Sequence, residues 1–126
     1  MAETPPGRLD DRRILVLEDE FFIADDLARQ LGDAGAEVIG PFATVDAAMA
    51  ALDATEGVDL ALLDLNLAGK LSYGIVDKLR ERQIPVVLAT GYDQRAIVET
   101  YRDIPRFQKP VSAPHLISTL SALLHA

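Results

Sequence analysis

Four places along the chain carry polar side chains directly after apolar runs, and together these side chains could perform phosphoryl transfer. Glu18 and Asp19 follow one run, Asp64 a second, Thr90 a third and Lys109 a fourth. Three neighbouring carboxylates are unfavourable unless a cation is present, and hard oxygen ligands with an incomplete shell suit Mg²⁺. A lysine ammonium can bind a phosphoryl oxygen. Because aspartates form acyl phosphates in other proteins, the set predicts a carboxylate nucleophile beside a metal.

Each of these residues alone has a simpler interpretation. An aspartate at a strand end is usually a turn residue or helix cap, and acidic side chains are favoured in the first turn of a helix. Thr-Gly and Lys-Pro often only end a strand. The combination of these residues favours a functional site, because unrelated turns rarely place an acid pair, an acid, a hydroxyl and a lysine at successive strand ends.

These side chains converge only if the apolar runs are strands of one sheet. Continuous Val, Ile and Leu runs without polar alternation are typical of parallel strands buried on both faces. We expect strands at residues 14–17, 37–39, 58–63, 84–89 and 104–108. The second strand, which ends at Gly40 and Pro41, offers no reactive group. Ligands of such sheets bind at the carboxyl ends of the strands, where the other four runs place their polar residues.

Between these runs, apolar residues recur at helical spacing. Ile23, Leu27 and Leu31 repeat every four residues, and Gly35 follows as the expected C-terminal cap. Thr44 is expected to cap a second helix. Further helices are expected around residues 75–79, from about 93 to 101, and after Ser112 as the last cap. Strands that alternate with helices predict an α/β domain with a parallel sheet and helices on both faces.

The 126 residues suit one globular domain, which we expect at residues 13–126 after a flexible lead-in at residues 1–12. The lack of cysteine excludes disulfides and thiolate metal sites. Twelve basic and 20 acidic residues give a net charge of −8, which argues against direct binding to nucleic acid or to anionic membranes. Because neither a spanning segment nor a signal peptide is evident, we expect a soluble, cytoplasmic protein.

Four motifs in this chain resemble the response-regulator receiver domain, the phosphoacceptor module of two-component signalling. The motifs are ILVLEDE, LLDLNLAG, LATGY and FQKP, and the resemblance extends from about Arg13 to Leu124. It implies a flavodoxin-like fold, a single domain whose five parallel strands have the order 2-1-3-4-5.

The resemblance implies a role for each polar residue. Asp64 would accept a phosphoryl group from a phosphohistidine. Asp19, Asp64 and the main-chain carbonyl of Asn66 would hold Mg²⁺, with Mn²⁺ able to substitute, and Glu18 would act on the metal mostly through water.

Other residues would act on the phosphoryl group or on its loss. Thr90 and Lys109 would contact the transferred group. Asn66 and Tyr92, each two positions beyond a site residue, would flank the attack path and modulate the rate of phosphate loss. The protein would catalyse its own phosphorylation and dephosphorylation without being a conventional enzyme.

The chain departs from the receiver pattern at Arg106. Receivers usually carry an aromatic switch residue three positions before the lysine, where this chain has Arg106, and the adjacent Phe107 should instead face the core. Thr-Gly-Tyr without that aromatic resembles a subgroup with a Phe-Ala-Thr-Gly-Tyr-like motif, although Leu88 replaces its first Phe. That subgroup includes single-domain regulators and general stress-response receivers.

The expected partners are proteins. A histidine kinase or histidine phosphotransfer protein would supply the phosphoryl group. A downstream protein would bind the face formed by the fourth helix, fifth strand and fifth helix, and its affinity would change as phosphorylation shifts the population of two states. The chain itself would be a monomer or a weak homodimer. His115 and His125 lack ligand partners at helical spacing and are expected at the surface.

Other interpretations remain open at this point. The chain could be a degenerate receiver that binds proteins without phosphorylation, or the receiver part of a larger regulator. A phosphatase of the haloacid dehalogenase type is disfavoured, because Asn66 stands where its second acid is needed. Nucleotide binding is disfavoured because the glycine-rich phosphate loops are missing.

Overall fold

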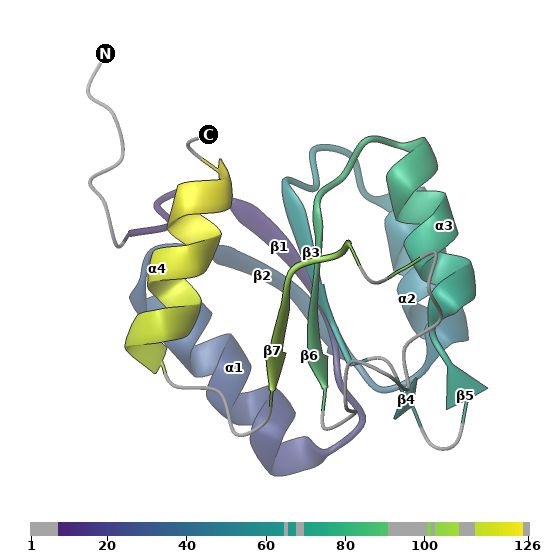
Figure 1. Ribbon diagram of the computed structural model, residues 1–126, viewed down its shortest axis with the longest axis horizontal. Helices are drawn as coiled ribbons and strands as arrows, with labels where there is room; N and C mark the ends of the chain where they lie inside the picture. Colours follow the sequence, from purple (N-terminus) through teal and green to yellow (C-terminus); the bar gives the residue numbers. More distant parts are fainter. Residues whose placement is uncertain are drawn as a thin grey trace.

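A five-stranded parallel sheet forms the centre of the protein, as seen in a computed structural model that describes residues 8–64, 66–67, 70–90, 101, 103–108 and 113–124. The strands are β1 (Arg13–Leu17), β2 (Glu37–Phe42), β3 (Leu60–Leu63), β6 (Val86–Thr90) and β7 (Arg106–Gln108). Their spatial order is β2-β1-β3-β6-β7, and every pairing is parallel (Figure 1). The predicted α/β class and the flavodoxin-like order 2-1-3-4-5 are therefore confirmed.

The described helices cover both faces of this sheet. They are α1 (Phe21–Asp33), α2 (Val45–Ala54), α3 (Tyr73–Glu81) and α4 (Ala113–Leu124). Helices α1 and α4 lie on one face, and α2 and α3 lie on the other (Figure 1). The helix predicted from about residue 93 to 101 lies outside the described residues, except for Tyr101, and Ser112 also lies outside them. No helix in the described part of the chain is long and apolar enough to cross a membrane.

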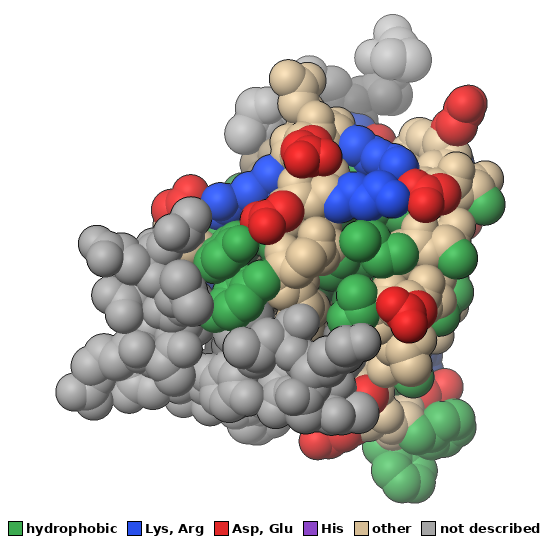
Figure 2. All heavy atoms as spheres, turned by 90° about the vertical axis from the view of Figure 1, so that its right-hand side faces the viewer, with side chains coloured by type: hydrophobic (Ala, Val, Ile, Leu, Met, Phe, Trp, Pro, Cys, Tyr) green, Lys and Arg blue, Asp and Glu red, His purple; other side chains and the backbone are tan. Residues whose placement is uncertain are grey.

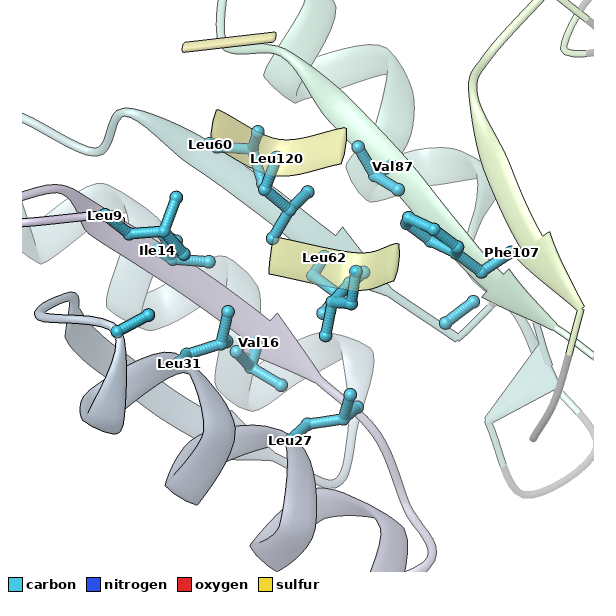
Figure 3. Packing of buried hydrophobic residues seen from close by; sticks show 13 residues of the cluster. Leu9, Ile14, Val16, Leu27, Leu31, Leu60, Leu62, Val87, Phe107 and Leu120 are labelled. Carbon is cyan, nitrogen blue, oxygen red and sulfur yellow. The ribbon is translucent and has the colours of Figure 1, made fainter. Parts of the chain in front are cut away.

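The core is divided by the sheet into two hydrophobic clusters. Successive residues of a strand point to opposite faces, so Ile14 and Val16 pack toward α1 and α4 while Leu15 and Leu17 pack toward α2 and α3. Figure 3 shows the first cluster, in which Ile14 and Val16 lie beside leucines of α1. Burial on both faces explains why these strands appear in the sequence as uninterrupted apolar runs.

Helix α1 ends as the sequence predicts. Gly35 has φ of +100°, the Gly35 N–H donates to the Gly32 carbonyl at 3.0 Å, and the Ala36 N–H donates to the Leu31 carbonyl at 3.0 Å. This pair of bonds is the Schellman motif, which favours glycine at the left-handed position. The Thr44 prediction is also confirmed, because its side chain accepts from the Ala47 N–H at 3.1 Å and caps α2.

Part of the predicted lead-in packs against the domain. Leu9 is fully buried in the cluster beneath α1 and α4, and its N–H donates to the Ala34 carbonyl at 2.8 Å. The Asp11 N–H donates to the Gly35 carbonyl at 3.0 Å. The packed part of the domain therefore begins before Arg13, the start predicted from the sequence.

Strand β2 extends beyond the predicted end at Gly40 and Pro41 and continues to Phe42. Gly40 adopts φ of +108°, and a Cβ there would lie 2.8 Å from the Val16 carbonyl oxygen, so glycine allows the strand to continue past an irregularity in its pairing with β1. The Glu18 N–H then donates to the Phe42 carbonyl at 2.9 Å. The longer strand thus supports the main chain of a predicted site residue.

Two features of the structure were not predicted. A short antiparallel pair, β4 (Asn66–Leu67) with β5 (Lys70–Leu71), follows β3. On the outer surface of α2 and α3, Asp53 lies between Lys78 and Arg82, so basic and acidic side chains alternate on the face that Figure 2 presents.

Candidate functional site

The ends of two adjacent strands bring the acidic residues together. Leu17 of β1 pairs with Leu63 of β3, and the Asp64 N–H donates to the Leu17 carbonyl at 2.8 Å. The residues that follow these strands therefore emerge side by side at the carboxyl edge of the sheet. Carboxylate oxygens of Glu18, Asp19 and Asp64 all lie within 4.8 Å of one another. The predicted convergence of these three residues is present in the structure.

Burial makes this cluster electrostatically unusual. Glu18 is 3% exposed, Asp64 is 7% exposed and Asp19 is half-buried. Like charges at such distances disfavour one another, and low exposure reduces the screening by water. Hard carboxylate oxygens gathered in this way are the ligands that Mg²⁺ prefers, so the donor set fits the predicted ion.

Backbone contacts hold Glu18 in place. Its N–H is bound to the Phe42 carbonyl, and its Oε1 accepts from the Glu20 N–H at 3.2 Å. Glu20 is the residue that precedes α1. Glu18 is thereby fixed between the end of β2 and the start of α1, facing the two aspartates.

Ser72 is a contributor that the sequence analysis missed. Its Oγ donates to the Asp64 main-chain carbonyl at 3.0 Å, and Ser72 is fully buried. It immediately precedes α3 but forms no side-chain cap bond there. A serine before a helical run normally indicates only an N-cap. The sequence contains no sign that this hydroxyl instead binds Asp64, the residue that follows β3.

The strand register also places Thr90 at this edge. Thr90 is the last residue of β6, it pairs with Gln108 of β7, and Leu88 two positions earlier pairs with Leu63. The backbone position matches the prediction, whereas the side chain is not described. Asn66 lies in β4, opposite Leu71, with its side chain likewise outside the description. Tyr92 and Lys109 lie outside the described residues.

Arg106 and Phe107 are adjacent residues of β7, but their side chains lie in different surroundings. Phe107 is buried among residues of the cluster beneath α1 and α4, as predicted, and its ring contacts the exposed His115 edge-on at 5.0 Å. Arg106 is half-buried, and its Nη1 lies 3.4 Å from the Ile104 carbonyl oxygen. An aromatic ring therefore does not occupy the usual switch position. His125 lies outside the described residues.

Comparison with known proteins places this site in a family. A family model, the response regulator receiver domain, matches residues 14–121. The transcriptional regulatory protein PdtaR of Mycobacterium tuberculosis is 30% identical over 113 residues, which cover 86% of this chain and 55% of PdtaR. The chain thus spans about half the length of this relative.

Solved structures give the same result. The solution structure of SdrG from Sphingomonas melonis Fr1 is 36% identical, with a TM-score of 0.79 over 90% of this chain and 97% of SdrG. The response regulator PhyR from Brucella abortus is 28% identical, with a TM-score of 0.81 over 94% of this chain and 50% of PhyR. Together with the strand order, these matches show that the chain belongs to the response regulator receiver domain family.

Proposed function

We propose that this receiver is a magnesium-dependent phosphoacceptor in which Asp64 takes a phosphoryl group from a phosphohistidine of a histidine kinase or phosphotransfer protein. The observation that carries the proposal is the cluster of Glu18, Asp19 and Asp64, three carboxylates within 4.8 Å at the carboxyl edge of a parallel sheet. Stability alone would not favour this arrangement, because the three groups repel one another.

The proposed transfer is a substitution at phosphorus. A carboxylate oxygen of Asp64 forms the new oxygen–phosphorus bond, while the nitrogen–phosphorus bond of the phosphohistidine breaks and its electron pair stays on the imidazole. The Ser72 bond to the Asp64 carbonyl and the Asp64 N–H bond to Leu17 orient the nucleophile. Asp19, Asp64 and the Asn66 carbonyl would hold Mg²⁺, with Glu18 acting through water, and the ion would supply charge neutralisation there.

Thr90 and Lys109 complete the proposed chemistry. The Thr90 hydroxyl would contact the new phosphoryl group from the end of β6, and the Lys109 ammonium would neutralise part of its charge. Phosphorylation adds about one to two negative charges at the edge, which shifts the population of two states. The surface that responds includes β7 and α4, and a downstream protein would bind there.

Two kinds of regulator fit this proposal. The match over 97% of SdrG supports a single receiver that signals by protein contact, as in the stress-response subgroup predicted from the strand-4 motif. The matches to about half of PdtaR and PhyR support a receiver that is one part of a larger regulator. The phosphoacceptor role of Asp64 is the same in both.

Intact-mass measurement tests the proposal. The native chain and Asp64→Asn are incubated with a small acyl phosphate, with Mg²⁺ or with a chelator. We expect a gain of one phosphoryl unit in the native chain with Mg²⁺ and no gain in the other three samples. If rapid hydrolysis removes the label, beryllofluoride binding replaces it as the readout. A native chain that gains no phosphoryl unit and binds neither Mg²⁺ nor beryllofluoride would instead support a degenerate receiver.

A further inference from the structure

One face of α3 holds Tyr101, a residue that lies far beyond the helix in the sequence. Tyr73, Asp77 and Arg80 share this face, because residues three or four positions apart are neighbours on a helix. The Tyr73 ring stacks on the Tyr101 ring, with centroids 4.2 Å apart and 19° between the ring planes. The Tyr101 hydroxyl donates to Asp77 at 2.8 Å, and the Arg80 guanidinium lies 5.5 Å from the centre of the Tyr101 ring. We call these four residues the tyrosine clamp.

The tyrosine clamp fixes the segment that leads into β7, which runs from the side of α3 to the sheet in Figure 1. The Ile104 N–H donates to the Tyr101 carbonyl at 3.2 Å, and Ile104 is buried in the cluster that faces α2 and α3. Arg80 also forms an ion pair with Asp103 at 2.8 Å, so a second residue of this segment is bound to the same face of α3. Arg106, the first residue of β7, has its Nη1 3.4 Å from the Ile104 carbonyl oxygen.

The start of α3 is bound to the proposed phosphoacceptor. The Ser72 Oγ donates to the Asp64 carbonyl at 3.0 Å, and Ser72 is fully buried. The Val76 N–H donates to the Ser72 carbonyl at 3.3 Å, which ties Ser72 to the first turn of the helix. Tyr73 is the next residue and the first of α3. A displacement of the Asp64 main chain would therefore reach the ring that stacks on Tyr101.

We propose that the tyrosine clamp transmits the phosphorylation state of Asp64 through α3 to β7 and α4. The proposal rests on the proposed function of Asp64 and adds the route by which its modification changes the partner surface. This chain has Arg106 where receivers usually carry the aromatic switch residue, so an aromatic contact elsewhere is needed. The energy of a ring stack depends on its geometry and so can differ between two states. Phe107 of β7 contacts His115 of α4 edge-on at 5.0 Å, which continues the route to α4.

The test follows the response to beryllofluoride, a mimic of the phosphoryl group, by NMR on isotope-labelled protein with Mg²⁺. The amides of β7 and α4 report on the partner surface, and the amides of Glu18 and Asp19 report on the site itself. For each variant, the free and beryllofluoride-bound forms are compared, so that direct effects of the substitution cancel. Thermal unfolding checks that each variant folds.

The variants separate the ring stack from the other contacts of the clamp. Tyr73→Ala and Tyr101→Ala each remove the stack, and Tyr101→Leu removes it while keeping an apolar side chain against the core. Tyr101→Phe keeps the stack and loses only the hydrogen bond to Asp77. Lys78→Ala is the matched control, because Lys78 also lies on α3 but pairs with Asp53 of α2.

The shift changes of β7 and α4 should be similar in the native chain, Tyr101→Phe and Lys78→Ala. They should fall about twofold or more in Tyr73→Ala, Tyr101→Ala and Tyr101→Leu, as expected when an aromatic contact that favours one state is lost. The double variant Tyr73→Ala/Tyr101→Ala should lose no more than either single variant, because both substitutions remove the same contact. The shift changes of Glu18 and Asp19 should be native-like throughout.

Native-like shift changes of β7 and α4 in Tyr101→Leu would overturn the proposal. A loss of the shift changes at Glu18 and Asp19 in the same variant would also overturn it, because the clamp would then support the site rather than transmit its state. If the alanine variants do not fold, Tyr101→Leu alone decides between these results.

Two further outcomes separate the tyrosine clamp from the proposed function. If beryllofluoride changes the native shifts at Glu18 and Asp19 but none in β7 and α4, the clamp is contradicted and the phosphoacceptor role of Asp64 stands. If the native chain neither binds beryllofluoride nor gains a phosphoryl unit from acetyl phosphate, the proposed function fails and the clamp fails with it.

Discussion

Acidic side chains have different neighbours at the amino edge and at the carboxyl edge of the sheet. At the amino edge, acidic side chains lie against arginines or main-chain donors: Asp59 accepts from the Arg13 N–H at 2.8 Å, and Arg13 forms an ion pair with Glu37 at 2.5 Å. Arg80 and Asp103 form another pair at 2.8 Å. At the carboxyl edge, carboxylate oxygens of three acidic residues gather within 4.8 Å of one another.

This difference separates residues that stabilise the fold from residues that act. At the amino edge, Asp59, Glu37 and Asp103 each lie against a hydrogen-bond donor, although exposed ion pairs contribute little free energy. At the carboxyl edge, Glu18, Asp19 and Asp64 bring like charges within 4.8 Å of one another, an arrangement that a bound cation would favour. Local conflicts of this kind are expected at functional sites, where ligand binding relieves them.

The largest expected effect is that of Asp19→Asn on phosphoryl uptake. Removing one charge from the metal ligands should slow Mg²⁺-dependent labelling by acetyl phosphate about 100-fold, similar to the loss of one electrostatic catalytic group. The rate is measured by intact mass over time at fixed Mg²⁺. Asp59→Asn, at the opposite edge, is the matched control and should label at the native rate; equal slowing of both would contradict the comparison.

Asp64→Asn should raise stability when no metal is present. The change removes one of three repelling charges and leaves intact the main-chain bond to Ser72, so the free energy of unfolding should rise by ~1 kcal/mol. Urea unfolding in the presence of a chelator measures this difference. Addition of Mg²⁺ should stabilise the native chain more than the variant, since only the native site is complete. A less stable variant without metal would show that repulsion is not significant there.

Asp59→Ala should have the opposite effect on stability. It leaves the half-buried Arg13 N–H without its acceptor, which should lower the free energy of unfolding by ~1 kcal/mol. Glu37→Ala removes an exposed ion pair at the same edge and should cost less than about 0.5 kcal/mol. Both variants should retain native phosphoryl uptake. A loss of phosphoryl uptake in either variant would mean that residues of the amino edge also affect the chemistry at the carboxyl edge.

The smallest expected effect concerns Tyr101. Its hydroxyl donates to Asp77 at 2.8 Å, and this bond raises the pKa of Tyr101 above its ordinary value. A raised pKa in the folded state adds stability that is fully present below about pH 10, the unfolded value, and is lost as pH rises through the folded value. The stability difference between the native chain and Tyr101→Phe should therefore shrink above pH 10 in urea unfolding. A difference that stays constant with pH would contradict this contact.

The sequence predicted the sheet and the acidic cluster because both depend on simple periodic signals. Doubly buried strands leave unbroken apolar runs, and the residue after each run must lie at the same edge. This reasoning located Glu18, Asp19 and Asp64, and the backbone position of Thr90. The same reasoning could not identify Ser72, because a buried hydroxyl bound to the carbonyl of a residue eight positions away produces no periodic pattern in the sequence.

Other features escaped prediction for physical reasons. The strands β4 and β5 have two residues each, too few for any alternation to appear. Leu9 is a single apolar residue among charged neighbours, and it is buried in the cluster that includes Leu31 and Ala34 at the end of α1. The continuation of β2 through Gly40 depends on a positive φ that the residue type permits but does not require.

The most direct test of the central claim is to locate the phosphoryl group among the acidic residues. After labelling with acetyl phosphate and Mg²⁺, borohydride reduction converts an aspartyl phosphate to homoserine, which peptide mass spectrometry can place in the sequence. We predict homoserine at position 64 and aspartate retained at positions 19 and 59. Homoserine at another acidic position, with Asp64 unchanged, would contradict the assignment of Asp64 as the phosphoacceptor.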